Sequence, residues 1–429
     1  DTVMLGAFGE VPLSASSLAN QFYNIFQICC MGMGGGAAVL TAQFWGSGNL
    51  PALRKTITIM LRFCICIALG FTLVTQLFSA RIMSIYTTDP EIIQSGVRYL
   101  DYLGWSYLLQ GLALTTTVVL RSCRIVRIPL FSTIGAFLLN VFFNWVFIFG
   151  NLGAPRMEIA GAALATVIAR VFECVFIFGY LIARDTHIAY RLRDLFLNCS
   201  DLVRDYFRYS MPVLISDILL AIGNNLVAIV IGRMGSSFVS ANAITMVVVQ
   251  LSTIFNQGVA NASSVSIGNT IGAGDREGAY RQGVTYFFLS CIVGVLAGGI
   301  ILLINPIVIG FYNITPETKA ITTQLMRAIS LIVVFQCNAM VMTKGVLRAG
   351  GDTKFLMLAD ILFLWIASVP LGMLAGFVFG LSPFWVYFFL KIDNVLKTIW
   401  CAHRLKSKKW IKSVDTAPPQ DNEAVLEGS

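Results

Sequence analysis

Long apolar runs dominate the pattern of hydrophobic and polar positions along the chain. Most are about 20 residues or longer, the length that an α-helix needs to cross the hydrocarbon core of a bilayer. A membrane β-barrel would instead show ~10-residue segments of alternating polarity. The α-helix is the other structure that satisfies all its backbone hydrogen bonds in lipid, so helices are predicted here. Eleven full spanning segments are predicted, at about 13–44, 57–80, 92–120, 129–150, 158–183, 206–232, 238–270, 282–312, 318–347, 355–379 and 383–403.

Lysine and arginine alternate between rich and poor loops along these segments. The rich loops and the C-terminal tail together hold 19 of them, whereas the intervening loops hold 4. Because positively charged loops stay in the cytoplasm, the C-terminus is expected to be cytoplasmic and the first full segment to run inward. Residues 7–13 then lie outside, and residues 1–6 are expected to end a further helix whose first half is missing from this chain.

The chain also repeats itself at an offset of 226 residues, which is a signature of duplicated architecture. Gly6 falls on Gly232, and the glycines of 46–48 fall on those of 272–274 without a gap. Further on, Leu-Arg at 120–121 matches Leu-Arg at 347–348 after a slip of one residue. Six helices per half give the two halves a parallel orientation, which is typical of transporters.

We therefore predict an all-α polytopic membrane protein with twelve helices in two six-helix lobes, of which the first helix is incomplete. The predicted boundaries are 1–183 for the N-lobe, 184–205 for a cytoplasmic interlobe linker, 206–412 for the C-lobe and 413–429 for a disordered cytoplasmic tail.

Composition supports the membrane assignment and excludes several functions. Hydrophobic residues make up 57% of the chain, charged residues only 12%, and the mean hydropathy is +0.77, whereas soluble domains carry about 25% charged residues. The net charge of +8 follows the cytoplasmic loops, so it does not indicate nucleic-acid binding. With two histidines and no C-x-x-C pair, a histidine metal site or catalytic triad is not expected. No ATP-binding motif occurs, so transport would be passive or driven by an ion gradient.

Several motifs in order resemble those of the MATE (multidrug and toxic compound extrusion) family, over residues 1 to about 412. They are "DTVMLGAFG", "GMGGGAAVLTAQFWGSGN", "NVFFNWVFIFG", "GAALATVIAR", "IGRMGSSFVSANAI", "SIGNTIGAGD", "VLRAGGDTK" and "RLKSKKWIK". Within the family the chain looks most similar to the DinF-like bacterial branch. The resemblance implies a secondary active antiporter of the plasma membrane that exports organic, often cationic compounds in exchange for H⁺ or Na⁺. It also implies two lobes around a cavity that opens to one side at a time.

From these observations we expect small organic substrates and the lipid bilayer as partners, a monomer, no enzyme activity and no cofactor beyond the coupling ion. A flippase for lipid-linked saccharides is the alternative within transport. It would need a more cationic cavity, whereas the intramembrane positive charges are few and lie mostly near helix ends. A membrane-embedded enzyme or receptor would not explain the six-plus-six repeat.

Candidate N-lobe residues follow from the cost of polar groups in hydrocarbon. A buried carboxylate titrates near neutral pH or binds a small cation, which is what ion coupling requires. By resemblance, Asp1 matches the acid of a "D-T-x-x-L-G" motif. Asn140 and Asn144 share a helix face and match an N-x-x-x-D pattern, from which Asn144 departs, so Asp1 remains the only acid of that pair. Thr166 matches a threonine of the family that faces the same cavity. Na⁺ is the one metal ion expected at this N-lobe site.

Each of these residues has a structural alternative. Asp1 would be a solvated helix end, the two asparagines would join helices by hydrogen bonds, and Thr166 would bond its own helix backbone. In the C-lobe, Leu220 and Cys337 occupy places where some branches of the family carry acids. Candidate cavity residues of the C-lobe are Asp217, Asn224, Asn225, Asn338 and Asp360.

Two charged pairs inside predicted helices have the spacing of ion pairs. Arg170 and Glu173 are three residues apart, and Asp393 and Lys397 are four apart, so each pair shares a helix face. We interpret both as structural.

Overall fold

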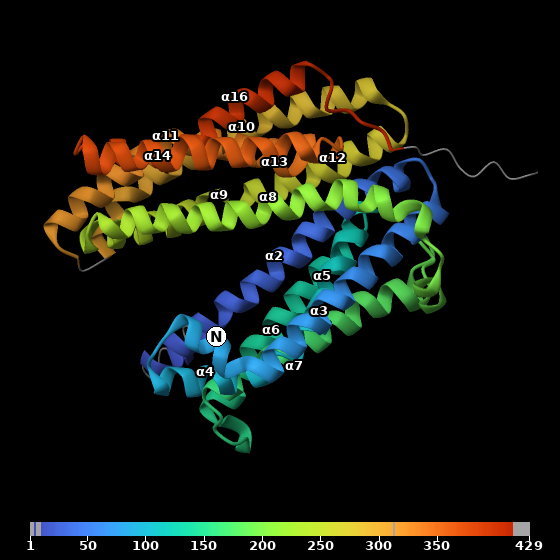
Figure 1. The fold of residues 1–429 in the computed structure, drawn as a ribbon, viewed down its shortest axis with the longest axis horizontal. Coiled ribbons are helices and arrows are strands. Elements are labelled where there is room, and N and C mark those ends of the chain that lie inside the picture. Colours follow the sequence, from blue (N-terminus) through green and yellow to red (C-terminus); the bar gives the residue numbers. More distant parts are fainter. Residues whose placement is uncertain (1–3, 6–9, 312–313, 415–429) are drawn as a thin grey trace, which may run out of the picture. The chain divides into compact units, whose positions relative to one another are not determined.

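The computed structural model describes residues 4–5, 10–311 and 314–414, and no strand occurs within these ranges (Figure 1). The predicted all-α architecture is confirmed. Asp1 and residues 415–429 of the predicted tail lie outside the described residues. The α-helices are α2 (Glu10–Gly46), α3 (Leu50–Tyr86), α4 (Pro90–Leu103), α5 (Ser106–Ser122), α6 (Arg127–Phe149), α7 (Ile159–Gly179), α8 (Ser200–Arg233), α9 (Ser236–Gly272), α10 (Arg276–Phe311), α11 (Pro316–Val341), α12 (Leu347–Ala349), α13 (Thr353–Ile361), α14 (Val369–Met373), α15 (Pro383–Leu390) and α16 (Asp393–Lys406).

Short irregular helices connect or interrupt these elements. Two are 3₁₀ turns, η1 (Asn151–Gly153) and η3 (Leu192–Phe196). Four are π-helical, η2 (Tyr180–Arg184), η4 (Met342–Val346), η5 (Leu362–Ser368) and η6 (Leu374–Val378).

Nine segments of the described chain are long and apolar enough to cross a membrane, some of them continuous across two or more of these elements. The pair α4 and α5 passes the same test together, although it bends by 55° at a short break. The predicted segment 92–120 therefore corresponds to two helices, α4 and α5, with a bend between them. The last predicted segment, 383–403, is also divided, because α15 ends at Leu390 and α16 begins at Asp393.

Local sequence signals set several helix ends. Asp89 accepts a hydrogen bond from the Glu91 backbone N–H and Pro90 occupies the first turn, which together start α4. Thr315 and Pro316 start α11 in the same way. Gly150 ends α6 in the left-handed conformation (φ 75°), which glycine adopts without steric cost.

The chain divides into two compact units whose boundary falls inside helices. Unit 1 comprises residues 1–41 and 50–214, and unit 2 comprises residues 42–49 and 215–429. The last turn of α2 thus belongs to unit 2, whereas the first turns of α8 belong to unit 1. This division differs from the predicted lobe boundaries mainly in the placement of residues 184–214.

In unit 1 the predicted linker packs against α3. The Thr58 hydroxyl lies 2.9 Å from the Tyr190 hydroxyl, and it donates to the Asp194 carbonyl. Burial raises the pKa of Tyr190 to about 12, so its hydroxyl stays protonated. The linker is therefore an integral part of unit 1.

Glycines let helices of the same unit approach closely. A Cβ on Gly36 would lie 2.2 Å from the Ser210 Cα, so α2 and the start of α8 are in backbone contact. In unit 2, a Cβ on Gly46 would lie 2.0 Å from the Asn269 carbonyl oxygen, and one on Gly272 would lie 2.0 Å from that of Gln43. Gly46 and Gly272 are 226 residues apart, and so are Gln43 and Asn269. The two contacts are therefore equivalent under the repeat, and the ends of α2 and α9 cross symmetrically.

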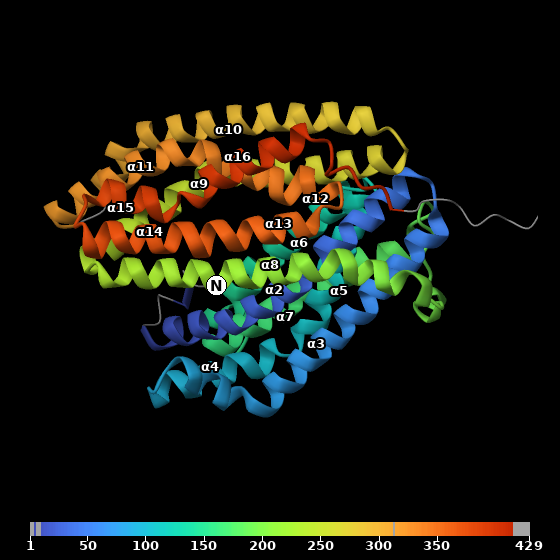
Figure 2. The ribbon, with the colours of Figure 1, turned by 45° about the horizontal axis from the view of Figure 1, so that its top comes forward.

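Unit 2 is built from helices that lie alongside one another. Helices α10 and α11 lie side by side, and α13, η5, α14 and η6 follow one another along one line (Figures 1 and 2). The π turns η4 and η5 each accommodate an extra residue relative to an α-helix. These irregularities, with the break at residues 391–392, lie around one cavity, which is described below.

Candidate functional site

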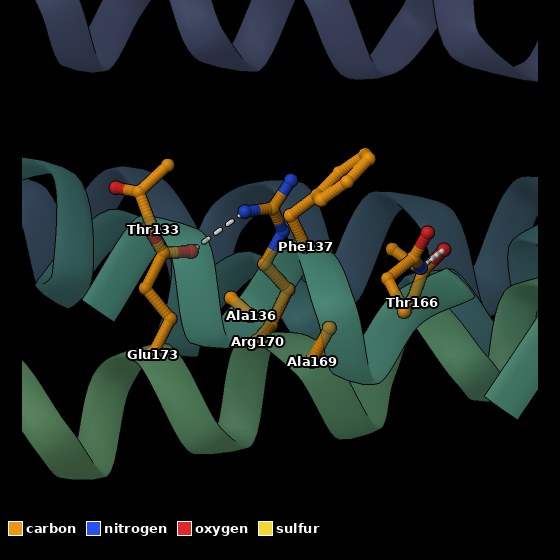
Figure 3. A pocket seen from close by; sticks show the side chains of 8 residues that line it. Thr133, Ala136, Phe137, Thr166, Ala169, Arg170 and Glu173 are labelled. Atoms are coloured by element: carbon orange, nitrogen blue, oxygen red, sulfur yellow. Dashed lines mark hydrogen bonds and ion pairs between the residues drawn. The ribbon is translucent and has the colours of Figure 1, made fainter. Parts of the chain in front are cut away.

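The first candidate site is a cavity of about 270 Å³ in unit 1, between α6 and α7. Polar groups gather in it although both helices are membrane spans (Figure 3). Its lining residues are Thr133, Ala136, Phe137 and Asn140 of α6, and Thr166, Ala169, Arg170 and Glu173 of α7. We call this the unit-1 cavity.

A chain of amide and hydroxyl hydrogen bonds runs along one wall of the unit-1 cavity. The Asn144 amide donates to the Asn140 side-chain oxygen at 3.0 Å, and the Asn140 amide donates to Thr166 Oγ1 at 3.4 Å. Thr166 in turn donates to the Ala162 carbonyl, one turn back on its own helix. The two asparagines thus share a face, as their spacing indicates, and Asn140 joins α6 to α7. Asn140 and Thr166 also line the cavity, whereas Asn144 is buried behind it.

Arg170 and Glu173 form an ion pair on the opposite part of the cavity wall. Arg170 Nη1 lies 2.6 Å from Glu173 Oε2, and Glu173 is 8% exposed. Figure 3 shows the guanidinium directed toward the carboxylate, beside Thr133 and Phe137. The ion pair that the spacing predicts is present, and it also lines the cavity, which the spacing alone does not indicate.

The arrangement supplies a carboxylate whose charge is balanced by one arginine. Arg170 Nε has no hydrogen-bond partner among the residues that the structure describes, and Glu173 is the carboxylate with which the guanidinium pairs. A proton or a cation that reaches Glu173 would compete with Arg170 for the same oxygens. The described part of unit 1 therefore holds a buried acid besides the predicted Asp1.

Three of the predicted C-lobe residues have partners away from any cavity described here. Asp217 lies 3.9 Å from Arg348, and Asn225 donates to the Ala221 carbonyl of its own helix. Asn338 is fully buried, where its amide donates to the Phe287 carbonyl and to Ser290 Oγ. This arrangement joins α11 to α10, which is a structural contact.

The other two, Asn224 and Asp360, line a second cavity of about 240 Å³ in unit 2, called here the unit-2 cavity. Its lining residues are Leu220, Asn224, Gln336, Ala339, Met340, Thr343, Lys344, Asp360, Leu364, Leu390, Lys391, Asp393, Asn394 and Lys397. Asp360 also accepts a hydrogen bond from Ser216 Oγ at 2.5 Å.

A buried triad of charges holds one wall of the unit-2 cavity together. Lys397 Nζ lies 2.9 Å from Asp360 Oδ1 and 3.2 Å from Asp393 Oδ2. All three residues are 6% exposed. The pair Asp393–Lys397 was expected from its spacing, whereas the partnership of Lys397 with Asp360 joins α16 to α13 and has no local sequence signal.

Lys344 and Lys391, which the sequence reading did not single out, also line the unit-2 cavity. Lys344 lies in the π turn η4, and Lys391 lies at the break between α15 and α16. The signal that could have found them is a lysine inside an apolar segment, since such residues usually mark functional positions in membrane helices.

Within the described residues, no group of three or more histidine, cysteine, aspartate or glutamate side chains could hold a metal ion. The Na⁺ site expected near Asp1 involves a residue that lies outside the described chain, so it stays a prediction.

Comparison with known proteins identifies related sequences over almost the whole chain. "Uncharacterized transporter YisQ" of Bacillus subtilis is 22% identical over 96% of this chain and 90% of its own length. "Probable multidrug resistance protein NorM" of Mesorhizobium japonicum is 27% identical, over 98% of this chain and 90% of its own. The protein of that name from Thermotoga maritima is 26% identical, over 90% and 83%.

Solved structures share the fold. A crystal structure of MATE in the bent conformation superposes with a TM-score of 0.85 at 17% identity, covering 95% of this chain and 90% of the other. A mutant of the Vibrio cholerae MATE transporter VcmN superposes with a TM-score of 0.86 at 14% identity, covering 96% and 92%. The MatE sequence profile matches residues 1–146 and 212–374, which is well over half of the chain. The chain therefore belongs to the MatE family of membrane transporters, whose relatives include multidrug efflux proteins.

Proposed function

We propose that the protein is a secondary active antiporter that exports organic, cationic amphipathic compounds in exchange for H⁺ or Na⁺. It would act in the plasma membrane as a monomer with a cytoplasmic C-terminus, by alternating access. The proposal is supported by the relatives named for multidrug resistance and by the alternation of loop charges.

The observation that carries the proposal is the ion pair in the unit-1 cavity. Glu173 is a buried carboxylate in a membrane span, and its partner Arg170 lies 2.6 Å away on the same helix. Protonation of Glu173 would remove the attraction for Arg170, and a bound cation would displace it. Competition of two cations for one carboxylate makes their binding mutually exclusive, which is the requirement of an antiporter.

Asp1 remains the second proposed coupling acid, with Asn140 and Thr166 as polar groups of the same site. In this proposal Asn140 and Thr166 orient the bound cation through their side-chain oxygens. Asn144 supports them by donating to Asn140.

The test is ethidium efflux from energised everted vesicles, with Na⁺ and pH gradients imposed separately. Glu173→Gln keeps the size of the side chain but cannot titrate, and we expect it to abolish gradient-driven efflux. The matched control is Glu158→Gln, because Glu158 lies in the same unit, is exposed and has Arg156 as an ion-pair partner at 3.6 Å. The control should export at the unsubstituted rate.

Full efflux by the Glu173→Gln protein would remove Glu173 from the coupling step. Asp1→Asn, tested in the same vesicles, then asks whether Asp1 alone couples transport. Absence of ethidium efflux under both gradients would contradict the proposed antiport of cations itself.

A further inference from the structure

The unit-2 cavity has an unusual charge composition for a site inside a membrane protein. Three lysines and two aspartates line it, so its formal charge is +1. Charged side chains within membrane spans are costly, and those that occur usually face a cavity and serve a function. The question is which of these charges are already neutralised by one another.

Both carboxylates are fully engaged. Asp360 uses one oxygen for Lys397 and the other for Ser216. Asp393 uses one oxygen for Lys397, while the other accepts from Ser368 Oγ at 3.1 Å and from the Asn394 amide at 3.2 Å. A cation entering the cavity would therefore have to break existing bonds to reach a carboxylate oxygen.

Two ammonium groups are left over. Within the described chain, no carboxylate lies within ion-pair distance of Lys344 or of Lys391. Lys344 is exposed and Lys391 is half-buried. The side-chain amides of Asn224 and Gln336 add uncharged hydrogen-bond donors to the same wall.

Backbone irregularities place both lysines at the cavity. Lys344 lies at the centre of the π turn η4, and such turns occur frequently at functional sites because they redirect side chains. Lys391 follows the last residue of α15 and precedes α16, at a break within the predicted last span. Discontinuous helices form the binding sites of many transporters.

We propose that the unit-2 cavity binds the anionic group, a carboxylate or a phosphate, of an amphipathic molecule. Lys344 and Lys391 bind the anion by charge, and the amides of Asn224 and Gln336 donate to it. The triad of Asp360, Lys397 and Asp393 keeps the wall in place. Resting on the proposed transport function, the inference adds acidic and zwitterionic compounds to the cationic substrates of the unit-1 cavity.

The test compares two fluorescent probes that differ in a single group. Dansylglycine carries a carboxylate, and dansylglycinamide carries a neutral amide in its place. Binding is measured by fluorescence titration of the full chain in phosphatidylcholine nanodiscs. We expect the acid to bind at least about tenfold more tightly than the amide, since a hydrogen bond to a charged group typically contributes this much.

The variants assign the preference to the two lysines. The double variant Lys344→Gln, Lys391→Gln should bind both probes equally. The double variant Lys344→Arg, Lys391→Arg should keep the preference for dansylglycine. Lys354→Gln is the matched control, because Lys354 is an exposed lysine of the same unit that does not line the cavity. Melting temperatures of all variants show that each is folded.

Equal binding of the two probes by the unsubstituted protein would overturn the proposal, and so would a preference that survives the double glutamine substitution. A second set of nanodiscs containing phosphatidylglycerol distinguishes the source of the anion. Weaker dansylglycine binding there assigns the site to a lipid phosphate, and unchanged binding assigns it to a soluble carboxylate. If ethidium is not exported but dansylglycine is still preferred, the proposed cation antiport fails while this site stands.

Discussion

Removal of the Lys397 ammonium should destabilise unit 2 far more than removal of an exposed lysine. In the Lys397→Met protein, Asp360 and Asp393 remain in place without the cation that lies 2.9 and 3.2 Å from them. Methionine matches the length of the lysine stem, so packing changes little and the lost charge dominates.

The magnitude follows from burial. All three side chains are 6% exposed, and removal of one partner from a buried ion pair costs about 3–5 kcal/mol, because an uncompensated charge remains. The comparison is Lys408→Met in the same unit, whose ion pair with Glu277 at 2.7 Å is about half exposed. Exposed pairs contribute about 0–1 kcal/mol.

The measurement is thermal unfolding in detergent. Unfolding is detected by a maleimide dye, which reacts with buried thiols as they become accessible. Cys401 is fully buried one turn after Lys397, so its thiol reacts as that region opens. We expect a clearly lower midpoint for Lys397→Met than for Lys408→Met. The triple variant Asp360→Asn, Lys397→Met, Asp393→Asn should recover part of the loss, because no unpaired charge is left. Equal midpoints for the two single variants would refute the reasoning.

Three further changes have defined outcomes. Asp352→Asn removes a carboxylate that is 1% exposed and pairs with Arg404 at 2.6 Å. We expect the free energy of unfolding to fall by about 1.5–3 kcal/mol and trypsin to cleave faster after residue 404. An unchanged cleavage rate would contradict this. Gly345→Ala places a Cβ 2.8 Å from a backbone oxygen, so we expect the free energy of unfolding to fall by about 1–3 kcal/mol. A Cβ at Gly299 has no atom within 4 Å, so Gly299→Ala should not lower the melting temperature. Asn140→Leu removes the hydrogen bond to Thr166 that joins α6 to α7, so we expect a loss of about 1 kcal/mol of stability and slower ethidium efflux. Unchanged efflux would exclude Asn140 from the cavity's function.

Hydrophobic runs predicted the spans well because length and apolarity decide membrane insertion residue by residue. They could not predict where a span bends. The break between α4 and α5 at Gly104 and Trp105 follows the charged Arg98 and Asp101. Charged residues also occur inside the unbroken helix α7, so they do not by themselves mark a bend. Helices α2 and α3 also extend beyond the predicted segments 13–44 and 57–80, since polar turns continue a helix in the headgroup region.

The candidate site was predictable only as far as it depends on a single helix. Spacing alone predicted that Arg170 and Glu173 would pair, and that Asn140 and Asn144 would share a face. It could not show that Arg170, Glu173 and Asn140 line one cavity, because this depends on how α6 packs against α7. Likewise, Lys397 has one partner four residues away and another 37 residues away, and only the first leaves a local pattern.

The π turn η4 also bears on the ancestry of the chain. The internal repeat keeps an offset of 226 residues through residue 274 and needs 227 at Leu347-Arg348. A π turn holds one residue more than the α-helix it replaces, and η4 ends immediately before Leu347, whereas the corresponding helix α5 is regular. The extra residue of η4 is therefore one place in the chain where the repeat can have gained its additional residue. An extra residue in η4 turns Lys344 relative to the preceding turns, and the corresponding positions of α5, Thr117 and Val118, carry no charge.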